Sequence, residues 1–250
     1  MDMKYRDWVV ATDGAVRAAV ATCFHDRALG GWQENAITRD VLLAIGAEQI
    51  VRWEAMPFQS AWQVFKAVGP YETSNGDIAM HVVLHAKNGH REVGSKHFEA
   101  KKLDLKTRSL SSIDVAQLAR MQYLPSHEVL LYVAGIDADQ STHASVHSLP
   151  TPIATMLLED GFSAMFRASH PFVGIFGQAL MGRGLNWDRT AATSLEVASR
   201  ASRRLPGYVL EAHLASNGLE LEPIQAPRGY ESLAGPKHNF DRDPSDDFHP

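Results

Sequence analysis

Apolar residues near the start of the chain recur with the period of an α-helix. Residues 12–24 and residues 34–47 both look helical, and the second segment places apolar side chains at spacings of three to five residues. In the second segment these side chains are Ile37, Val41, Leu42 and Ile45. Side chains at this spacing share one face of a helix, so the pattern predicts two amphipathic helices that pack against a core.

The pattern then changes to that of an antiparallel hairpin. Residues 77–84 and residues 96–103 are both typical of strands. Asn88 and Gly89 lie between them, and this dipeptide is a strong signal for a hairpin turn. We therefore expect the two strands to pair with each other.

Two shorter segments precede the hairpin. Residues 49–56 predict a strand. In residues 58–68 the bulky side chains Phe58, Trp62 and Phe65 return at helical spacing, so this segment predicts a short inserted helix.

The elements after the hairpin are predicted from caps and apolar runs. Residues 111–123 begin with a serine cap and an acidic first turn, which predicts a helix. Residues 127–135 form a continuous apolar run, typical of a strand buried on both faces. Further along, residues 151–166 and 193–205 predict two more helices, and residues 207–215 predict another strand.

These elements predict one α/β domain over residues 1–225. Its core, at about residues 12–135, has the order helix, strand, strand, strand, helix, strand, and residues 136–225 extend it with helices and a strand. Residues 226–250 contain proline, glycine and acidic residues with little periodicity, so we expect a loosely ordered tail.

Composition excludes several classes of protein. The 250-residue chain has a formal net charge of −5, so binding to a polyanion would need a local basic patch or a metal ion. No segment approaches the roughly 18 apolar residues of a membrane span, and the first residues lack a signal-peptide run, so we expect a soluble cytoplasmic protein without a membrane partner. Cys23, the single cysteine, excludes an internal disulfide and is expected to be an inert buried thiol.

Charged residues interrupt the strands of the predicted hairpin. Strand side chains alternate, so Glu99 and Lys101 share one face and lie about 6.6 Å apart along the strand. Asp77 opens the preceding strand and brings a second carboxylate alongside if the register allows it. Two carboxylates and water make an oxygen site that suits Mg²⁺ or Mn²⁺. The alternatives are a turn residue at Asp77 and a solvated salt bridge between Glu99 and Lys101.

Two polar residues on the predicted helices fit the same site. Glu34 precedes Val41 by seven residues, so it lies within about 20° of the apolar stripe; alternatively, it only complements the helix dipole. Gln117 lies between Ile113 and Met121 at four-residue steps. A buried amide there would bond a site water or a phosphate, or else mark the edge of the core.

Together these residues resemble a known family. Asp77, then Glu99 and Lys101 with one residue between them, and Glu34 and Gln117 on the flanking helices resemble the PD-(D/E)XK nuclease superfamily over about residues 12–135. The resemblance implies a restriction-endonuclease-like αβββαβ core, with a mixed central sheet flanked by helices. It implies that Asp77, Glu99 and Glu34 hold the metal, that Lys101 is the catalytic lysine, and that Gln117 is the glutamine of one branch.

The implied activity is that of an endonuclease dependent on Mg²⁺ or Mn²⁺ that hydrolyses phosphodiester bonds, with DNA favoured as the nucleic acid. Restriction, phage defence and repair are all compatible with it, as are a homodimer and a partner subunit. Lys102, Lys106 and Arg108 follow the catalytic strand and are expected to contact phosphates. The chain departs from the family at Gly76, where the family name has proline, and in the 22-residue step from Asp77 to Glu99.

Two other functions are weighed against the nuclease. The first is a non-catalytic subunit that keeps the fold to bind nucleic acid or a protein. The second is a small-molecule metalloenzyme built on histidines, for which His143 and His147 have ligand spacing if their segment is helical. His81 shares a strand face with Asp77, and we expect His97 to be partly exposed.

Overall fold

A computed structural model describes residues 2–46, 50–68, 78–103, 115–121, 126–190, 196 and 206–233, in which eleven strands join one sheet. The strands are β1 (Asp2–Met3), β2 (Val51–Trp53), β3 (Phe58–Ala67), β4 (Ile78–His85), β5 (Arg91–Lys102), β6 (His127–Ile136), β7 (Thr142–Pro150), β8 (His170–Pro171), β9 (Asn186–Asp188), β10 (Tyr208–Ser216) and β11 (Tyr230–Ser232). The helices are α1 (Tyr5–His25), the short 3-10 helix η1 (Asp26–Leu29), α2 (Glu34–Ile45), α3 (Val115–Met121), α4 (Thr151–Met156), α5 (Phe162–Ala168) and α6 (Phe172–Leu180).

The sheet is mixed, and its strand order is β1-β2-β3-β10-β4-β5-β6-β7-β8, with β11 beside β3 and β9 beside β5. The predicted hairpin is confirmed, because β4 and β5 pair antiparallel from Ile78 opposite Phe98 to His85 opposite Arg91. β6 is parallel to β5. β10 lies between β3 and β4, antiparallel to the first and parallel to the second. A strand from late in the sequence thus completes the middle of the sheet.

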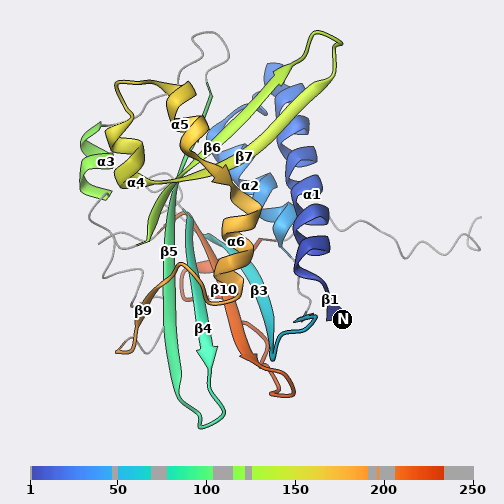
Figure 1. The fold of residues 1–250 in the computed structure, drawn as a ribbon, viewed down its shortest axis with the longest axis vertical. Helices are drawn as coiled ribbons and strands as arrows, with labels where there is room; N and C mark the ends of the chain where they lie inside the picture. The colour runs from blue at the N-terminus through green and yellow to red at the C-terminus, as the bar shows by residue number, and fades with distance from the viewer. Residues whose placement is uncertain are drawn as a thin grey trace, which may run out of the picture.

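Helices α1, α2 and α6 pack on one side of the sheet, which we call the core face (Figure 1). Phe98 and Ala100 of β5 point to this side and join the main hydrophobic cluster with residues from all three helices. The predicted stripe of the second helix is confirmed: Ile37, Val41, Leu42 and Ile45 of α2 are buried in that cluster. The core face is therefore a conventional apolar layer.

The opposite side of the sheet is covered in part by α3, α4 and α5, which lie together beside β6 and β7 (Figure 1). Leu118 of α3 packs there with Val129 and Leu131 of β6. In register, Val129 lies opposite Glu99 and Leu131 opposite Lys101, so these charged residues share the same side. We call this side the polar face.

The predicted inserted helix over residues 58–68 is wrong, because Phe58–Ala67 form strand β3. Trp62 and Val64 pack into the main cluster, whereas Phe65 and Ala67 pack with Val209 on the polar face. Both faces of β3 are covered, so apolar residues occur at both parities and imitate a helical period.

Other predicted elements have mixed outcomes. The buried strand at 127–135 and the strand at 207–215 are confirmed as β6 and β10. The helix expected at 151–166 is two short helices, α4 and α5, separated around Gly161, whose φ of 77° favours glycine. Of the helix expected at 193–205, only Glu196 lies within the described residues, and it is helical.

Part of the expected tail is ordered. Tyr230–Ser232 form β11 and pair with Phe65–Ala67 of β3, because Tyr230 is buried and its hydroxyl donates a hydrogen bond to the Pro206 carbonyl at 2.7 Å. Residues 234–250 lie outside the described residues. Separately, none of the described helices is long and apolar enough to cross a membrane.

Candidate functional site

Strand β5 carries the candidate site at its C-terminal half. Because side chains alternate along a strand, Phe98 and Ala100 enter the apolar core while Glu99 and Lys101 point to the polar face. Glu99 is 3% exposed and Lys101 is 5% exposed. The alternative of a solvated salt bridge on the surface is therefore wrong.

Glu99 and Lys101 form a buried ion pair that uses only one carboxylate oxygen. The ammonium Nζ of Lys101 lies 2.5 Å from Oε1 of Glu99. Oε2 of Glu99 is buried and has no hydrogen-bond partner among the described residues. A buried carboxylate oxygen without a partner is costly, so this atom is suited to accept a ligand that the described residues do not supply.

Glu34 belongs to the same electrostatic environment. It is the first residue of α2 and is half-buried. Burial raises the pKa of Glu34, the charge of Lys101 opposes this rise, and the charge of Glu99 adds to it. Glu34 is therefore close enough to Glu99 and Lys101 for their charges to act on it.

The end of β5 is tied to the loop before α2. Nζ of Lys102 donates a hydrogen bond to the Trp32 carbonyl at 2.7 Å, and Nε1 of Trp32 donates to the Leu103 carbonyl at 3.1 Å. These two bonds hold the start of α2 beside the candidate site. Lys102, which is expected to contact phosphate, also forms this hydrogen bond to the protein backbone.

Several predicted site residues are not placed beside Glu99. Asp77, Lys106 and Arg108 lie outside the described residues. Gln117 is half-buried on α3, which packs with α4 over β6, the strand next to β5. Within the described part of the chain, no group of three or more histidine, cysteine, aspartate or glutamate residues is arranged to hold a metal ion.

Histidines form a further part of the polar face, and sequence reasoning placed His81 by strand parity but not the burial of His97. His97 is buried rather than partly exposed, and His81 is completely buried, with their ring centroids 6.1 Å apart. Burial lowers the pKa of His81 to about 3, with His97 contributing, and burial lowers the pKa of His97 to about 4. Both rings are therefore neutral at pH 7.

Other histidines continue this row across the sheet. His127 of β6 lies opposite His97, and its Nδ1 is 2.7 Å from the Thr151 hydroxyl. At the other end, the rings of His85 and His213 are 4.7 Å apart. The signal in the sequence was strand parity, since His81, His85 and His97 fall on the same side of the hairpin as Glu99 and opposite to Phe98.

A second buried lysine–glutamate pair lies on the core face of the same strand. Lys96 is paired with Glu128 of β6. Ser148 of β7 donates a hydrogen bond to the other oxygen of Glu128, and Lys96 Nζ also approaches the Gly184 carbonyl at 3.4 Å. Both carboxylate oxygens of this pair are satisfied.

The histidine pair proposed for zinc is separated. The segment with His143 and His147 is strand β7, so the two are not neighbours on a helix. His143 Nδ1 lies 3.0 Å from an Asp137 carboxylate oxygen, and His147 Nδ1 lies 3.1 Å from the Ser169 hydroxyl. This zinc alternative is wrong.

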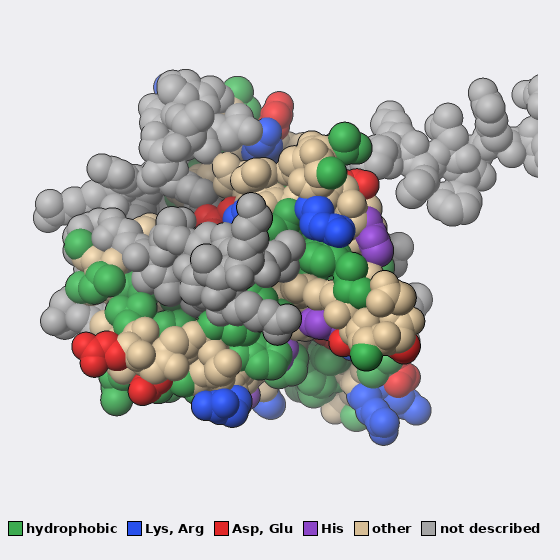
Figure 2. Space-filling model, turned by 90° about the horizontal axis from the view of Figure 1, so that it is seen from above, with side chains coloured by type: hydrophobic (Ala, Val, Ile, Leu, Met, Phe, Trp, Pro, Cys, Tyr) green, Lys and Arg blue, Asp and Glu red, His purple; other side chains and the backbone are tan. Residues whose placement is uncertain are grey.

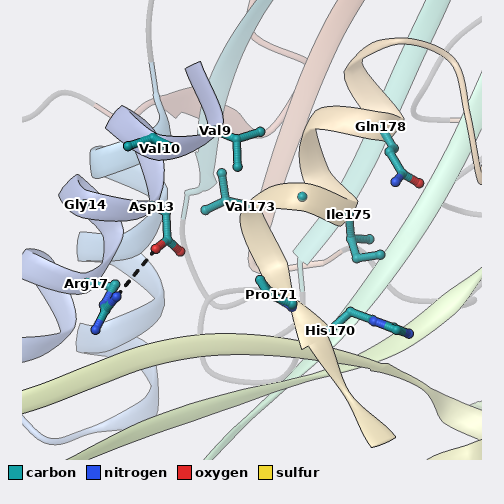
Figure 3. Close-up of a pocket in the computed structure, with 11 residues that line it drawn as sticks. Val9, Val10, Asp13, Gly14, Arg17, His170, Pro171, Val173, Ile175 and Gln178 are labelled. Atoms are coloured by element: carbon teal, nitrogen blue, oxygen red, sulfur yellow. Dashed lines mark ion pairs between the residues drawn. The ribbon is translucent and has the colours of Figure 1, made fainter. Parts of the chain in front are cut away.

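The surface offers two further observations. In Figure 2, the Lys and Arg side chains of the described residues on that face are dispersed among acidic and apolar ones. A groove of about 750 Å³ lies between α1 and the β8–α6 segment, lined largely by apolar side chains such as Val9, Val10 and Val173 (Figure 3). Asp13 and Arg17, 3.9 Å apart, border it. It lies at the helices of the core face, apart from the Glu99–Lys101 pair.

Comparisons with protein-family models, with curated proteins and with solved structures found no match.

Proposed function

We propose that the protein is a metal-dependent nuclease that hydrolyses phosphodiester bonds, with DNA as the favoured substrate. The observation that carries the proposal is the buried Glu99–Lys101 pair with its unpartnered Oε2 atom, beside the half-buried Glu34. Buried charges are normally paired and fully hydrogen-bonded unless they serve a site. The pair thus supports a catalytic reading of the E-x-K pattern.

The residues fit a hard divalent cation. Glu99 supplies a carboxylate oxygen that the described residues leave unpartnered, and Glu34 adds a second carboxylate nearby. Asp77 directly precedes Ile78, which lies opposite Phe98, the residue before Glu99, and we propose Asp77 as the third carboxylate. Bound Mg²⁺ or Mn²⁺ would lower the pKa of a water molecule and offset charge on the phosphate.

The protein side chains have separate roles in this proposal. Lys101 pairs with Glu99, and its ammonium orients the attacking water or offsets negative charge on the phosphate oxygens. Because Glu99 and Lys101 are almost completely buried, their interactions are stronger than they would be in water. Gln117 is proposed to bond a site water or a phosphate.

The order of elements supports the restriction-endonuclease-like fold as part of the proposal. α2, β3, β4, β5, α3 and β6 occur in this order along the chain as helix, three strands, helix and strand, with the short strand β2 between α2 and β3. β10, inserted between β3 and β4, is an addition to that core. We also propose a cytoplasmic role in restriction, phage defence or repair. A homodimer would supply two active sites, one for each DNA strand.

The first test is cleavage of supercoiled, linear and single-stranded DNA and of RNA, each in Mg²⁺, Mn²⁺ and EDTA. Lys101→Met keeps the length of the side chain and removes its charge, and we expect it to reduce the metal-dependent rate by about 10²- to 10³-fold, as loss of one charge-stabilising donor does. Lys96→Met is the matched control, since it makes the same change in a buried pair on the other face of β5.

Rates are compared per folded molecule, with folding monitored by circular dichroism. The proposal is sustained if Lys101→Met loses cleavage while folded Lys96→Met retains it. Equal loss in both variants, or wild-type cleavage that survives EDTA, would overturn the proposed site.

A second candidate is a non-catalytic domain that binds nucleic acid or a protein. It is favoured by the Lys101 ammonium, which occupies one oxygen of Glu99, and by the lack of a three-residue metal group within the described residues. This candidate predicts that wild type shifts DNA in a gel but cuts no substrate in any metal.

A further inference from the structure

His81 and His97 leave four buried ring nitrogens without a hydrogen-bond partner in the described part of the chain. Each unsatisfied buried polar atom costs roughly 1–3 kcal/mol, so such a group calls for a ligand. His81 has no exposed surface and His97 is 7% exposed. The pair is thus buried without the contacts that normally accompany burial.

The geometry of the pair suits a shared ion. The rings are almost perpendicular, at 78°, with centroids 6.1 Å apart. Two imidazoles that bind one ion through metal–nitrogen bonds of about 2.0–2.1 Å have centroids about 5–6 Å apart. The observed separation of the two rings is close to this range.

Glu99 supplies the third donor and the charge that a buried cation needs. His97 and Glu99 are two residues apart on the same face of β5, and Oε2 of Glu99 has no hydrogen-bond partner among the described residues. The described donors do not already converge on one point, so binding of an ion requires the side chains to adjust. A carboxylate there would offset the charge of an ion held by two neutral imidazoles.

We propose that His81, His97 and Glu99 form a binding site for a divalent transition-metal ion such as Zn²⁺ or Co²⁺. Imidazole nitrogen favours these ions over Mg²⁺, which prefers oxygen ligands. Both imidazoles are buried, and none of their ring nitrogens has a hydrogen-bond partner among the described residues, so these nitrogens are available to bind metal. The site would leave coordination positions for water or a substrate atom.

The experiment measures metal directly and needs no enzymatic activity. Metal-free protein is titrated with Zn²⁺, Co²⁺ and Mg²⁺ in equilibrium dialysis, and X-ray absorption of the zinc-loaded wild type counts imidazole ligands. We expect one tight ion per chain with two imidazoles and oxygen in its first shell. A first shell with no imidazole, or no tight ion at all, would mean that the orphan nitrogens are satisfied by water and would overturn the proposal.

Variants assign the ion to these residues. Removing an outer-shell partner of a metal ligand typically lowers affinity by about 10- to 100-fold. His81→Asn and His97→Asn each remove a direct ligand, so each is expected to lower zinc affinity by more than that. His143→Asn, in an exposed histidine–aspartate pair, is the control for surface binding. A tight ion lost in His143→Asn and kept in the other two would contradict the assignment.

This inference does not rest on the nuclease proposal. If wild type binds zinc as expected but cuts nothing, the nuclease proposal fails and the metal site stands. If Mg²⁺-dependent cleavage depends on Lys101 and no transition-metal ion binds, the reverse holds. If both stand, zinc and Mg²⁺ should compete, because both sites use Oε2 of Glu99.

Discussion

Strand β5 contributes a lysine to each of two buried lysine–glutamate pairs, one on each face of the sheet. The pairs differ in how many of their carboxylate oxygens have hydrogen-bond partners. On the core face, Lys96 pairs with Glu128, the Ser148 hydroxyl donates a hydrogen bond to Glu128, and Lys96 approaches the Gly184 carbonyl. On the polar face, Lys101 occupies one oxygen of Glu99 while the other oxygen has no partner among the described residues.

The difference separates a structural pair from one with spare binding capacity. A saturated network contributes rigidity, because each buried polar atom has a partner and nothing is gained by adding a ligand. An incomplete network leaves a buried charged atom without a hydrogen-bond partner. Unsatisfied buried groups of this kind are found at active sites, where a ligand can satisfy them. Pairs of the same two residue types, each with a lysine from β5, thus have different roles on the two faces.

Lys96→Met should give the largest change in stability. Removing one partner leaves the Glu128 carboxylate buried without its counter-charge, so we expect the free energy of unfolding in urea to fall by about 3–5 kcal/mol. Arg39→Met, in an exposed pair with Asp40, is the control and should change it by less than about 1 kcal/mol. Equal effects of the two variants would mean that the core-face pair is not structural.

Replacing both members of the polar-face pair sharpens the comparison. In the double variant with Glu99→Leu and Lys101→Met, we expect the unfolding free energy to stay unchanged or to rise by about 1–4 kcal/mol, because the desolvated charges are gone. Cleavage should be abolished. The corresponding double variant at Glu128 and Lys96 should lose stability, since it strands the Ser148 hydroxyl. A large loss at Glu99 and Lys101 would make that pair structural too.

Ser148→Ala makes the core-face pair resemble the polar-face pair by removing one hydrogen bond to Glu128. We expect a loss of about 1–3 kcal/mol in thermal or urea unfolding, the cost of an unsatisfied buried acceptor. Ser141→Ala, at an exposed turn, should change stability by less than about 0.5 kcal/mol. No difference between the two serine variants would show that Glu128 does not need its second partner.

Acid should also act on the polar face, through its buried histidines, and this gives the smallest expected change in the free energy of unfolding per pH unit. Burial lowers the pKa of His81 to about 3, below its ordinary 6.5, so the unfolded chain binds a proton that the folded chain does not. The free energy of unfolding is therefore unaffected by protonation of His81 above about pH 6.5. As the pH falls from about 6.5 towards 3, it decreases by about 1.4 kcal/mol per pH unit.

Urea unfolding at pH 7, 6 and 5 measures the slope, which His81→Leu should reduce and the exposed-site variant His143→Asn should leave unchanged. A His81→Leu protein with the wild-type slope would show that this histidine does not titrate as its burial requires.

The sequence predicted those features of the site that depend on neighbouring residues in the chain. The Asn-Gly turn fixed the hairpin, and strand parity placed Glu99 and Lys101 on the face opposite Phe98. The pairing of Glu128 with Lys96 and the position of β10 depend on strands distant in sequence, which periodicity does not report. Strand β3 was mistaken for a helix because a strand covered on both faces loses the alternation that marks strands.

The place of β10 in the sheet has a consequence for biosynthesis. Until residues 208–216 leave the ribosome, β3 and β4 each lack the neighbour that separates them in the finished sheet. Open strand edges are templates for pairing with other chains, and long-range pairings form slowly. Nascent chains that stop before residue 208 are therefore expected to aggregate or to bind chaperones, and the sheet is completed only after residues 208–216 have been synthesised.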